Sequence, residues 1–322
     1  MKVGLVLSGG GGKGAYEIGV WKAIKELGID RYIKAISGTS IGAFNAALFA
    51  QNDFEEAERL WKEVTLEKMM PINSRELIKK GITLAVGSRT MAFAKKYMAS
   101  KLEHGDVPRD GATDIINRYI NVKKIRASGI NCYVSCTEMP EFTVKYFKLN
   151  DYEDDIVKSI LMATACVPMI YESEAIYDKT YLDGGLTDNT PIKPVYEDGC
   201  DIIIAVLLDK LGTVNRQDFP NAKIIEIIPS DMETKILEGL LNLDDEAKTK
   251  RIQRGYEDTK NLLEPIFEIA RYQYKEQLKQ ESIQKEIQRK ANENENEKAN
   301  ENENWWRKKK REIRDRIFNK KR

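Results

Sequence analysis

The first fifty residues repeat one pattern twice: a short apolar segment, a glycine-rich turn and a stretch suited to a helix. Residues 3–7 lead into a turn at 8–14 that holds five glycines, and residues 32–36 lead into the sequence SGTSIGA. Apolar segments of this kind are typical of buried strands, and consecutive strand–helix units favour a parallel sheet with both turns at one edge. The repeat predicts an α/β fold of three layers, α/β/α, with a mainly parallel central sheet.

The second turn places Ser40 between Gly38 and Gly42 in a G-x-S-x-G pattern. This pattern is typical of a nucleophile elbow, a tight strand-to-helix turn that presents a serine hydroxyl. Glycines flank the serine because side chains there would clash. The same pattern also arises by chance where small residues pack a helix against a sheet. Ser40 is therefore a candidate nucleophile that needs a base and an oxyanion hole from elsewhere in the chain.

The first turn is a candidate oxyanion hole. The backbone N–H groups of Gly9, Gly10 and Gly11 can converge on one point, and the following helix adds the positive end of its dipole. The turn does not fit a phosphate-binding P-loop, because Lys13 is followed by Gly14 where that motif has Ser or Thr. A dinucleotide site is a minor alternative, because the second strand ends in serine where such sites carry an acidic residue.

Two residues compete for the role of base. The chain has one histidine, His104, in a polar segment that reads as a solvated loop. A Ser-His-Asp triad would require that residue. Asp183 follows an apolar strand and precedes Gly184 and Gly185, so its carboxylate sits on a tight turn, although an ordinary Asx turn has the same composition. We expect Asp183 to act as the base.

Three motifs in one order resemble the patatin-like phospholipase family: residues 8–14, residues 38–42 and the Asp-Gly-Gly sequence at 183–185. The chain looks like a bacterial-type member. The likeness extends through residues 163–168 and 186–192 and covers roughly residues 3–230. Lys13 stands where many members have arginine, so a bidentate role for this side chain is not expected.

The resemblance implies a catalytic dyad, with Ser40 as nucleophile and Asp183 as its only partner. The backbone N–H groups of Gly10 and Gly11, together with Gly9, would form the oxyanion hole. The motifs are completed by Gly12, Lys13, Gly14, Gly38, Gly42, Gly184 and Gly185. The implied reaction is hydrolysis of fatty-acyl esters of lipids through an acyl-enzyme, as in a phospholipase A or lysophospholipase, with no metal or cofactor.

None of these motifs specifies the head group or the acyl acceptor. A carboxylesterase, a thioesterase or an acyltransferase on the same dyad therefore stays open as an alternative. So does a non-catalytic lipid-binding scaffold that keeps the fold.

Charge is distributed unevenly along a nearly neutral chain of 52 Lys and Arg against 51 Asp and Glu, a balance that argues against a nucleic-acid partner. Residues 305–322 hold ten basic and two acidic residues, a net +8, which leaves −7 for residues 1–304. Trp306, Ile313 and Ile317 fall on one helical face among these basic residues. Such a helix suits an anionic membrane surface, and the alternative is a solvated basic tail.

Composition also predicts the domain organisation. We expect a catalytic domain over residues 1–270, a charged helical and Asn-Glu-rich linker over 271–304, and the basic amphipathic tail over 305–322. The linker is expected to be partly disordered, because it has too little apolar surface to offset the entropy of ordering.

The cysteines and the N-terminus predict a cytoplasmic location, peripheral to a membrane where the tail binds. Cys132, Cys136, Cys166 and Cys200 lie in apolar segments without metal-ligand pairing and read as reduced structural residues. The apolar run at residues 3–7 is too short for a signal peptide or a membrane span.

Periodicity predicts the remaining elements. We expect helices at residues 15–27, 43–50, 53–64, 74–80 and 155–164, a segment capping the site at 84–102, and strands at 127–137, 142–149, 201–208 and 223–228.

Overall fold

A computed structural model describes residues 2–69, 71, 102–209, 212–231, 239 and 241–319. The chain divides into two compact units, Met1–Leu262 and Leu263–Arg322. We call the first unit the body and the second the distal helix.

The described part of the body contains one sheet of eight strands, in the order β5-β6-β3-β2-β1-β7-β8, with β4 paired to β3. The strands are β1 (Val3–Leu7), β2 (Ile33–Thr39), β3 (Asn131–Met139), β4 (Thr143–Lys148), β5 (Glu174–Ile176), β6 (Lys179–Asp183), β7 (Ile202–Val206) and β8 (Lys223–Ile227). Strands β3, β2, β1, β7 and β8 run parallel. Strands β4 and β6 pair antiparallel with β3, and β5 pairs antiparallel with β6. The predicted α/β class with a mainly parallel sheet is confirmed.

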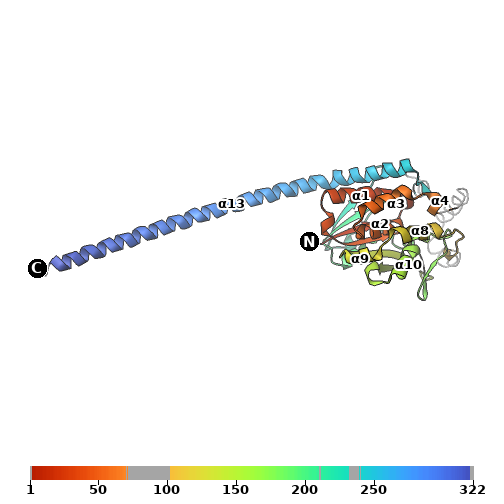
Figure 1. The fold of residues 1–322 in the computed structure, drawn as a ribbon, viewed down its shortest axis with the longest axis horizontal. Coiled ribbons are helices and arrows are strands. Elements are labelled where there is room, and N and C mark those ends of the chain that lie inside the picture. Colours follow the sequence, from red (N-terminus) through yellow and green to blue (C-terminus); the bar gives the residue numbers. More distant parts are fainter. Residues whose placement is uncertain are drawn as a thin grey trace. The chain divides into compact units, whose positions relative to one another are not determined.

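Helices cover both faces of this sheet. The described helices of the body are α1 (Ala15–Glu26), α2 (Ile41–Ala50), α3 (Phe54–Glu63), α4 (Leu66–Met69), α8 (Asp110–Tyr119), α9 (Val122–Ala127), α10 (Asp154–Ala165), α11 (Ile192–Glu197) and the first turns of α13 (Asp245–Asn319). Helix α2 crosses β1, β2 and β3, and α1 and α3 pack beside it (Figure 1). On the other face, Val195 of α11 packs on Val6, Ala35 and Ile203, because alternate residues of a strand face opposite sides.

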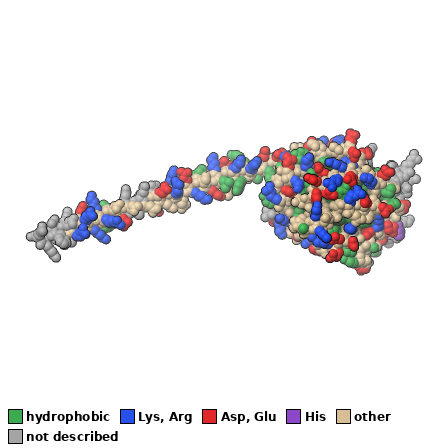
Figure 2. Space-filling model, viewed as in Figure 1, with side chains coloured by type: hydrophobic (Ala, Val, Ile, Leu, Met, Phe, Trp, Pro, Cys, Tyr) green, Lys and Arg blue, Asp and Glu red, His purple; other side chains and the backbone are tan. Residues whose placement is uncertain are grey.

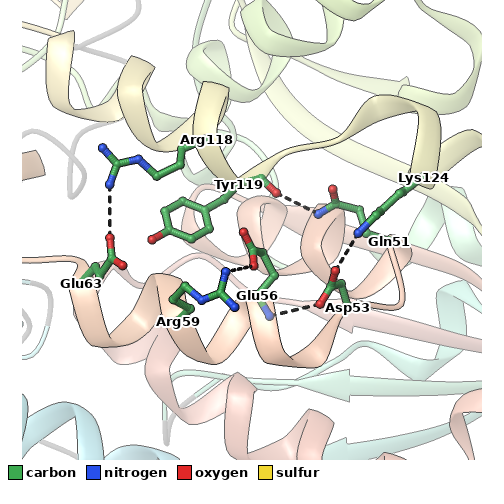
Figure 3. Close-up of polar contacts among 8 residues, drawn as sticks. All are labelled: Gln51, Asp53, Glu56, Arg59, Glu63, Arg118, Tyr119 and Lys124. Atoms are coloured by element: carbon green, nitrogen blue, oxygen red, sulfur yellow. Dashed lines mark hydrogen bonds and ion pairs between the residues drawn. The ribbon is translucent and has the colours of Figure 1, made fainter.

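A row of polar contacts joins helix α3, together with Gln51 and Asp53 just before it, to helices α8 and α9 (Figure 3). The contacts are Lys124 Nζ with Asp53 Oδ2 at 2.7 Å, Arg118 Nη1 with Glu63 Oε2 at 3.2 Å, and Gln51 Nε2 with the Tyr119 carbonyl at 3.2 Å. The charged pairs are partly exposed, so each contributes little stability. Their effect is to set the register of α8 and α9 against the helical layer.

One predicted boundary is wrong. Strand β3 begins at Asn131, whereas the pattern predicts strand from Ala127. Ala127 instead ends α9, a helix capped by the Asn121 side chain, which accepts a hydrogen bond from the Lys124 N–H. Gly129, at a φ of 72°, then turns the chain into β3.

The other described predictions agree with the structure. The predicted helices at 15–27, 43–50, 53–64 and 155–164 correspond to α1, α2, α3 and α10, and the predicted strands at 142–149, 201–208 and 223–228 correspond to β4, β7 and β8. The predicted helix at 74–80 and the predicted cap at 84–102, apart from its last residue, lie outside the described residues.

The four cysteines are free and buried. Burial raises the pKa of the Cys132 and Cys166 thiols to about 12, so neither is a ready nucleophile at neutral pH. This agrees with their prediction as reduced structural residues.

Helix α13 runs from the body into the distal helix. Residues 271–304, the predicted linker, lie within α13, and basic and acidic side chains are interspersed along the described part of the distal helix (Figure 2). The division by contacts falls after Leu262, and the predicted boundaries at 270 and 304 stay predictions. None of the helices in the described ranges combines the length and apolar character that crossing a membrane requires.

Candidate active site

Ser40 occupies a sharp turn between β2 and α2. Its φ of 53° and ψ of −126° lie in a region that L-residues rarely adopt. A Cβ on Gly38 would lie 2.2 Å from the Gly42 carbonyl oxygen, and one on Gly42 would lie 2.4 Å from the Leu7 carbonyl oxygen. The turn therefore requires glycine on both sides of the serine, and it is the elbow that the G-x-S-x-G pattern predicts.

Two neighbouring elements hold this strained residue in place. The Ser40 N–H donates a hydrogen bond of 2.9 Å to Thr164 Oγ1 on α10. The Thr164 hydroxyl in turn donates at 2.7 Å to the Ser135 carbonyl on β3. Thr164 has no exposed surface, so this relay is shielded from water. The direction of the Ser40 side chain is thus fixed by the surrounding fold.

Strand pairing brings Asp183 to Ser40. Strand β2 ends at Thr39, which pairs with Ser135 of β3. Strand β6 runs in the opposite direction and ends at Asp183, which pairs with Cys136. Because Ser135 and Cys136 are consecutive, the ends of β2 and β6 meet over the same point of β3. There the Ser40 side chain lies close enough to the Asp183 carboxyl group to lower its pKa.

Asp183 is buried, with 7% of the residue exposed. Burial raises its pKa to about 6, while hydrogen bonds from the Gly185 N–H and from Ser40 oppose part of that rise. The Gly185 N–H lies 2.7 Å from Asp183 Oδ1. At neutral pH the group is still mostly ionised, and it is a stronger base than a solvated aspartate.

The first glycine-rich turn lies against the same point. A Cβ on Gly9 would lie 3.3 Å from the Cβ of Ser40. The Gly9 N–H donates to the Asn189 carbonyl at 3.2 Å, and Asn189 Nδ2 donates back to the Gly9 carbonyl at 3.1 Å. Because this clamp occupies the Gly9 N–H, Gly10 and Gly11 are the better oxyanion donors among the three glycines predicted for that role.

The other residues of the three motifs serve close packing. A Cβ would lie 2.4 Å from the Asn242 carbonyl oxygen at Gly12, 2.7 Å from Ile41 at Gly14 and 2.3 Å from the Ser135 carbonyl oxygen at Gly184. At Gly185 it would lie 3.0 Å from Asn189 Oδ1. Lys13 is buried with its Nζ 3.4 Å from the Leu208 carbonyl oxygen.

The sequence patterns did not predict a buried polar cluster that lies next to the glycine-rich turn. Asn45 of α2 donates from Nδ2 to the Gly14 carbonyl at 3.0 Å and to Glu17 Oε2 at 2.7 Å, and Trp61 Nε1 donates to Asn45 Oδ1 at 2.9 Å. Glu17 has no exposed surface, and burial raises its pKa well above the ordinary range. The cluster ties the helix after Ser40 to the turn before α1. An asparagine inside the otherwise apolar sequence of α2 is the signal that could have revealed it.

His104 does not belong to this site. Its side chain is 74% exposed, and its Nδ1 lies 3.0 Å from Glu172 Oε1. The solvated-loop interpretation is therefore confirmed, and the carboxyl group next to Ser40 is that of Asp183. Among the described residues, no group of three or more His, Cys, Asp or Glu side chains is placed to hold a metal ion.

A family model described as patatin-like phospholipase matches residues 5–196. Lysophospholipase NTE1 of Kluyveromyces lactis is 27% identical over 204 residues, which make up 63% of this chain but only 12% of the yeast protein. Lysophospholipase nte1 of Aspergillus terreus is 58% identical over 50 residues, 16% of this chain and 3% of the fungal protein. The crystal structure of VipD from Legionella pneumophila covers 82% of this chain and 67% of its own, with a TM-score of 0.47 and 14% identity.

Proposed function

Since the chain belongs to the patatin-like phospholipase family, we propose that it hydrolyses fatty-acyl esters of lipids, with Ser40 as the nucleophile and Asp183 as the base. One observation carries this proposal. Ser40 is held on a strained elbow beside the buried carboxylate of Asp183, whose pKa is raised to about 6. A serine hydroxyl is a weak nucleophile unless an adjacent base removes its proton, and this arrangement supplies that base.

The first half of the reaction forms an acyl-enzyme. Ser40 Oγ attacks the ester carbonyl carbon while its proton moves to the Asp183 carboxylate. The carbonyl oxygen becomes an oxyanion, which the N–H groups of Gly10 and Gly11 stabilise. The intermediate then collapses, the bond to the alcohol breaks, and Asp183 returns the proton to the leaving oxygen.

The second half releases the fatty acid. Asp183 takes a proton from water as the water oxygen attacks the acyl carbon on Ser40. The same donors hold the second oxyanion. Its collapse breaks the bond between the acyl carbon and Ser40 Oγ, and Asp183 returns the proton to that oxygen. Neither half needs a group beyond those in the described site.

The substrate class is taken from the relatives. The two relatives named lysophospholipase suggest that the substrate of this chain is an ester of a lysophospholipid or a phospholipid. Because the chain spans 12% of the yeast relative, the substrate of that whole protein comes to this chain only as a proposal. An esterase, thioesterase or acyltransferase activity would use the same dyad with a different leaving group or acceptor.

The decisive test compares wild type with Ser40→Ala. Wild type should turn over a chromogenic acyl ester and react covalently with a fluorophosphonate probe. Ser40→Ala should lose both, because the attacking oxygen is gone; loss of the catalytic serine in such enzymes costs on the order of 10⁶ in kcat. Covalent labelling that persists in Ser40→Ala would remove this residue from the role.

The substrate is tested by lipid mass spectrometry after incubation with mixed phospholipids and lysophospholipids. Free fatty acid that appears with wild type and not with Ser40→Ala identifies the hydrolase and its head-group preference. Acyl transfer to an added alcohol would instead favour an acyltransferase. If the wild-type protein binds these lipids but has no esterase activity, the non-catalytic scaffold would be favoured.

We also propose that residues 305–322 contact an anionic membrane surface, from a cytoplasmic location that suits the four reduced cysteines. Trp305, Trp306 and Ile313 are each about half exposed, and Lys309 Nζ lies 4.2 Å from the centre of the Trp305 ring. Exposed indoles among basic side chains suit the interface of a bilayer.

Vesicle co-sedimentation tests this contact. Vesicles that contain phosphatidylserine should bind the full chain at low salt and release it as salt rises, because screening weakens the attraction. A chain lacking residues 305–322 should bind them poorly. Equal binding by the two chains would reject the proposal.

A further inference from the structure

The glycine-rich turn is covered on its outer side by a segment that follows the residues matched by the family model. Arg251, on α13 within the body, is 4% exposed. Its Nη1 donates to the Gly12 carbonyl at 2.9 Å and to the Asn242 carbonyl at 2.6 Å. The guanidinium group therefore bridges the turn and the loop that enters α13. The family match ends at residue 196, so this contact joins the glycine-rich turn to a part of the chain that the match does not include.

The carbonyl that Arg251 holds controls the orientation of the predicted oxyanion donors. The Gly12 carbonyl and the Lys13 N–H belong to one planar peptide unit. The Lys13 N–H donates to the Gly10 carbonyl at 3.1 Å, which closes the turn. In a trans peptide the Gly11 N–H points away from the Gly10 carbonyl. Fixing the Gly12 carbonyl therefore fixes, through this turn, the direction of the Gly11 N–H.

Arg251 is itself held rigidly. Helices α1 and α13 cross at two glycines: a Cβ on Gly19 would lie 1.9 Å from the Ile252 carbonyl oxygen, and one on Gly255 would lie 2.0 Å from the Tyr16 carbonyl oxygen. One turn before Arg251, Lys248 Nζ donates to the Val64 carbonyl at 2.8 Å. With α13 packed this closely on α1, a displacement of the turn must displace the guanidinium group or break its bonds.

We propose that Arg251 is a positioning residue for the oxyanion hole, acting through the Gly12 carbonyl. This inference rests on the proposed acyl-ester hydrolysis and adds to it a residue from the C-terminal helix. Both hydrogen bonds leave one nitrogen, Nη1, so a lysine ammonium group should restore them in part, although its stem differs from that of arginine in length and shape. The start of α13 is then part of the catalytic unit.

The catalytic test uses the full chain with Arg251→Met, Arg251→Lys and a control, Arg254→Met, on the same helix. Arg254 is partly exposed, with its Nη1 3.4 Å from Ser230 Oγ. Arg251→Met should lower kcat by about 10- to 100-fold, because misplacement of a catalytic group by about 1 Å costs rate on this scale. KM for a chromogenic acyl ester should change little, and Arg251→Lys should recover part of kcat. The rate of fluorophosphonate labelling should fall in parallel, and Arg254→Met should match wild type.

A second measurement does not depend on activity. Hydrogen–deuterium exchange at the amides of residues 8–18 should speed up in Arg251→Met, at a temperature where near-UV circular dichroism shows a folded chain. Exchange at these amides that matches wild type would overturn the positioning role, whatever the activity. So would a kcat that stays within about twofold of wild type. A wild type that neither labels nor turns over esters would refute the proposed function, and the exchange measurement would still decide whether Arg251 holds the turn.

Discussion

At Asp183 the protein keeps a carboxylate almost out of contact with water, and the raised pKa that results suits the proposed role of base. A solvated aspartate with a pKa near 4 would accept the Ser40 proton poorly. The same burial disfavours the ionised form in the folded state. The residue therefore couples catalytic strength to a cost in stability, and both can be measured as functions of pH.

The first prediction concerns the pH dependence of activity. Wild-type kcat/KM should be level at neutral pH and fall about tenfold per unit below about pH 6, because protonated Asp183 cannot accept the Ser40 proton. Initial rates on an uncharged chromogenic ester will show this, with circular dichroism at each pH as the control for unfolding. A rate that shows no acid limb between pH 7 and about pH 4 would contradict the role of Asp183.

The second prediction concerns Asp183→Asn. Between about pH 4 and about pH 6 the folded state holds a proton that the unfolded state has released, so wild-type stability falls as pH rises through this window. Asparagine cannot ionise and still accepts from the Gly185 N–H. The variant should lose most of its turnover. Above pH 6 its free energy of unfolding should exceed that of wild type by at most about 3 kcal/mol, and its thermal midpoint should be higher.

This difference in thermal midpoint should shrink as pH falls and vanish below about pH 3, where the wild-type carboxyl group is protonated in both states. A variant less stable than wild type at pH 7 and of equal stability at about pH 3 would show that the ionised carboxylate stabilises the fold. Near-normal turnover by Asp183→Asn would remove the dyad.

At the scale of elements, the site depends on where strands end and how closely helices approach. Strands β2 and β6 end over adjacent residues of β3, which brings together Ser40 and Asp183, the proposed nucleophile and base. Helix α13 lies against α1 with glycine at both close contacts, and this crossing places Arg251 on the glycine-rich turn. The same backbone contact at a glycine can therefore decide both stability and the geometry of the site.

The third prediction tests this crossing with Gly255→Ala. Helix propensity alone predicts that alanine stabilises α13 by about 1 kcal/mol. A Cβ at this position would lie 2.0 Å from the Tyr16 carbonyl oxygen, so the helices must separate. We expect a net loss of about 1–3 kcal/mol, measured by urea denaturation. A gain in stability would show that the crossing is looser than the structure indicates.

At the scale of the molecule, the body and the distal helix carry different properties. The body contains the sheet and every residue of the candidate site. The described part of the distal helix exposes most of its side chains and carries the two exposed tryptophans. Catalysis on a soluble ester should therefore belong to the body, and attachment to a membrane surface should belong to the distal helix.

The fourth prediction compares two truncations. A chain ending at Leu262 keeps Lys248 and Arg251, and its thermal midpoint and its turnover of a soluble ester should equal those of the full chain. A chain ending at Asp244 lacks both side chains and the crossing with α1, so it should be much less stable or fail to fold. Equal behaviour of the two truncations would show that the start of α13 is dispensable.

The sequence by itself determined the features that follow from local sterics. Most strands, the glycine-rich turn and the elbow at Ser40 are set by residues close in the chain, whereas β5 was not predicted. At the elbow, only glycine tolerates the contacts at Gly38 and Gly42. Asp183 could be chosen from its own turn once His104 stood in a solvated segment. Even there, the local pattern placed the start of β3 too early, because Asn121 caps the start of a helix that runs to Ala127.

Only the tertiary structure decided which distant groups meet. Asn189 reaches Gly9 across 180 residues and Arg251 reaches Gly12 across 239. Glu17 looks like any helix-surface glutamate until Asn45 and Trp61 close over it. Such contacts depend on how α1, α2 and α13 pack, and no spacing in the sequence encodes the distance between two helices. The residues proposed to do the chemistry could therefore be predicted from local sequence, whereas those that hold them in place became visible only in the fold.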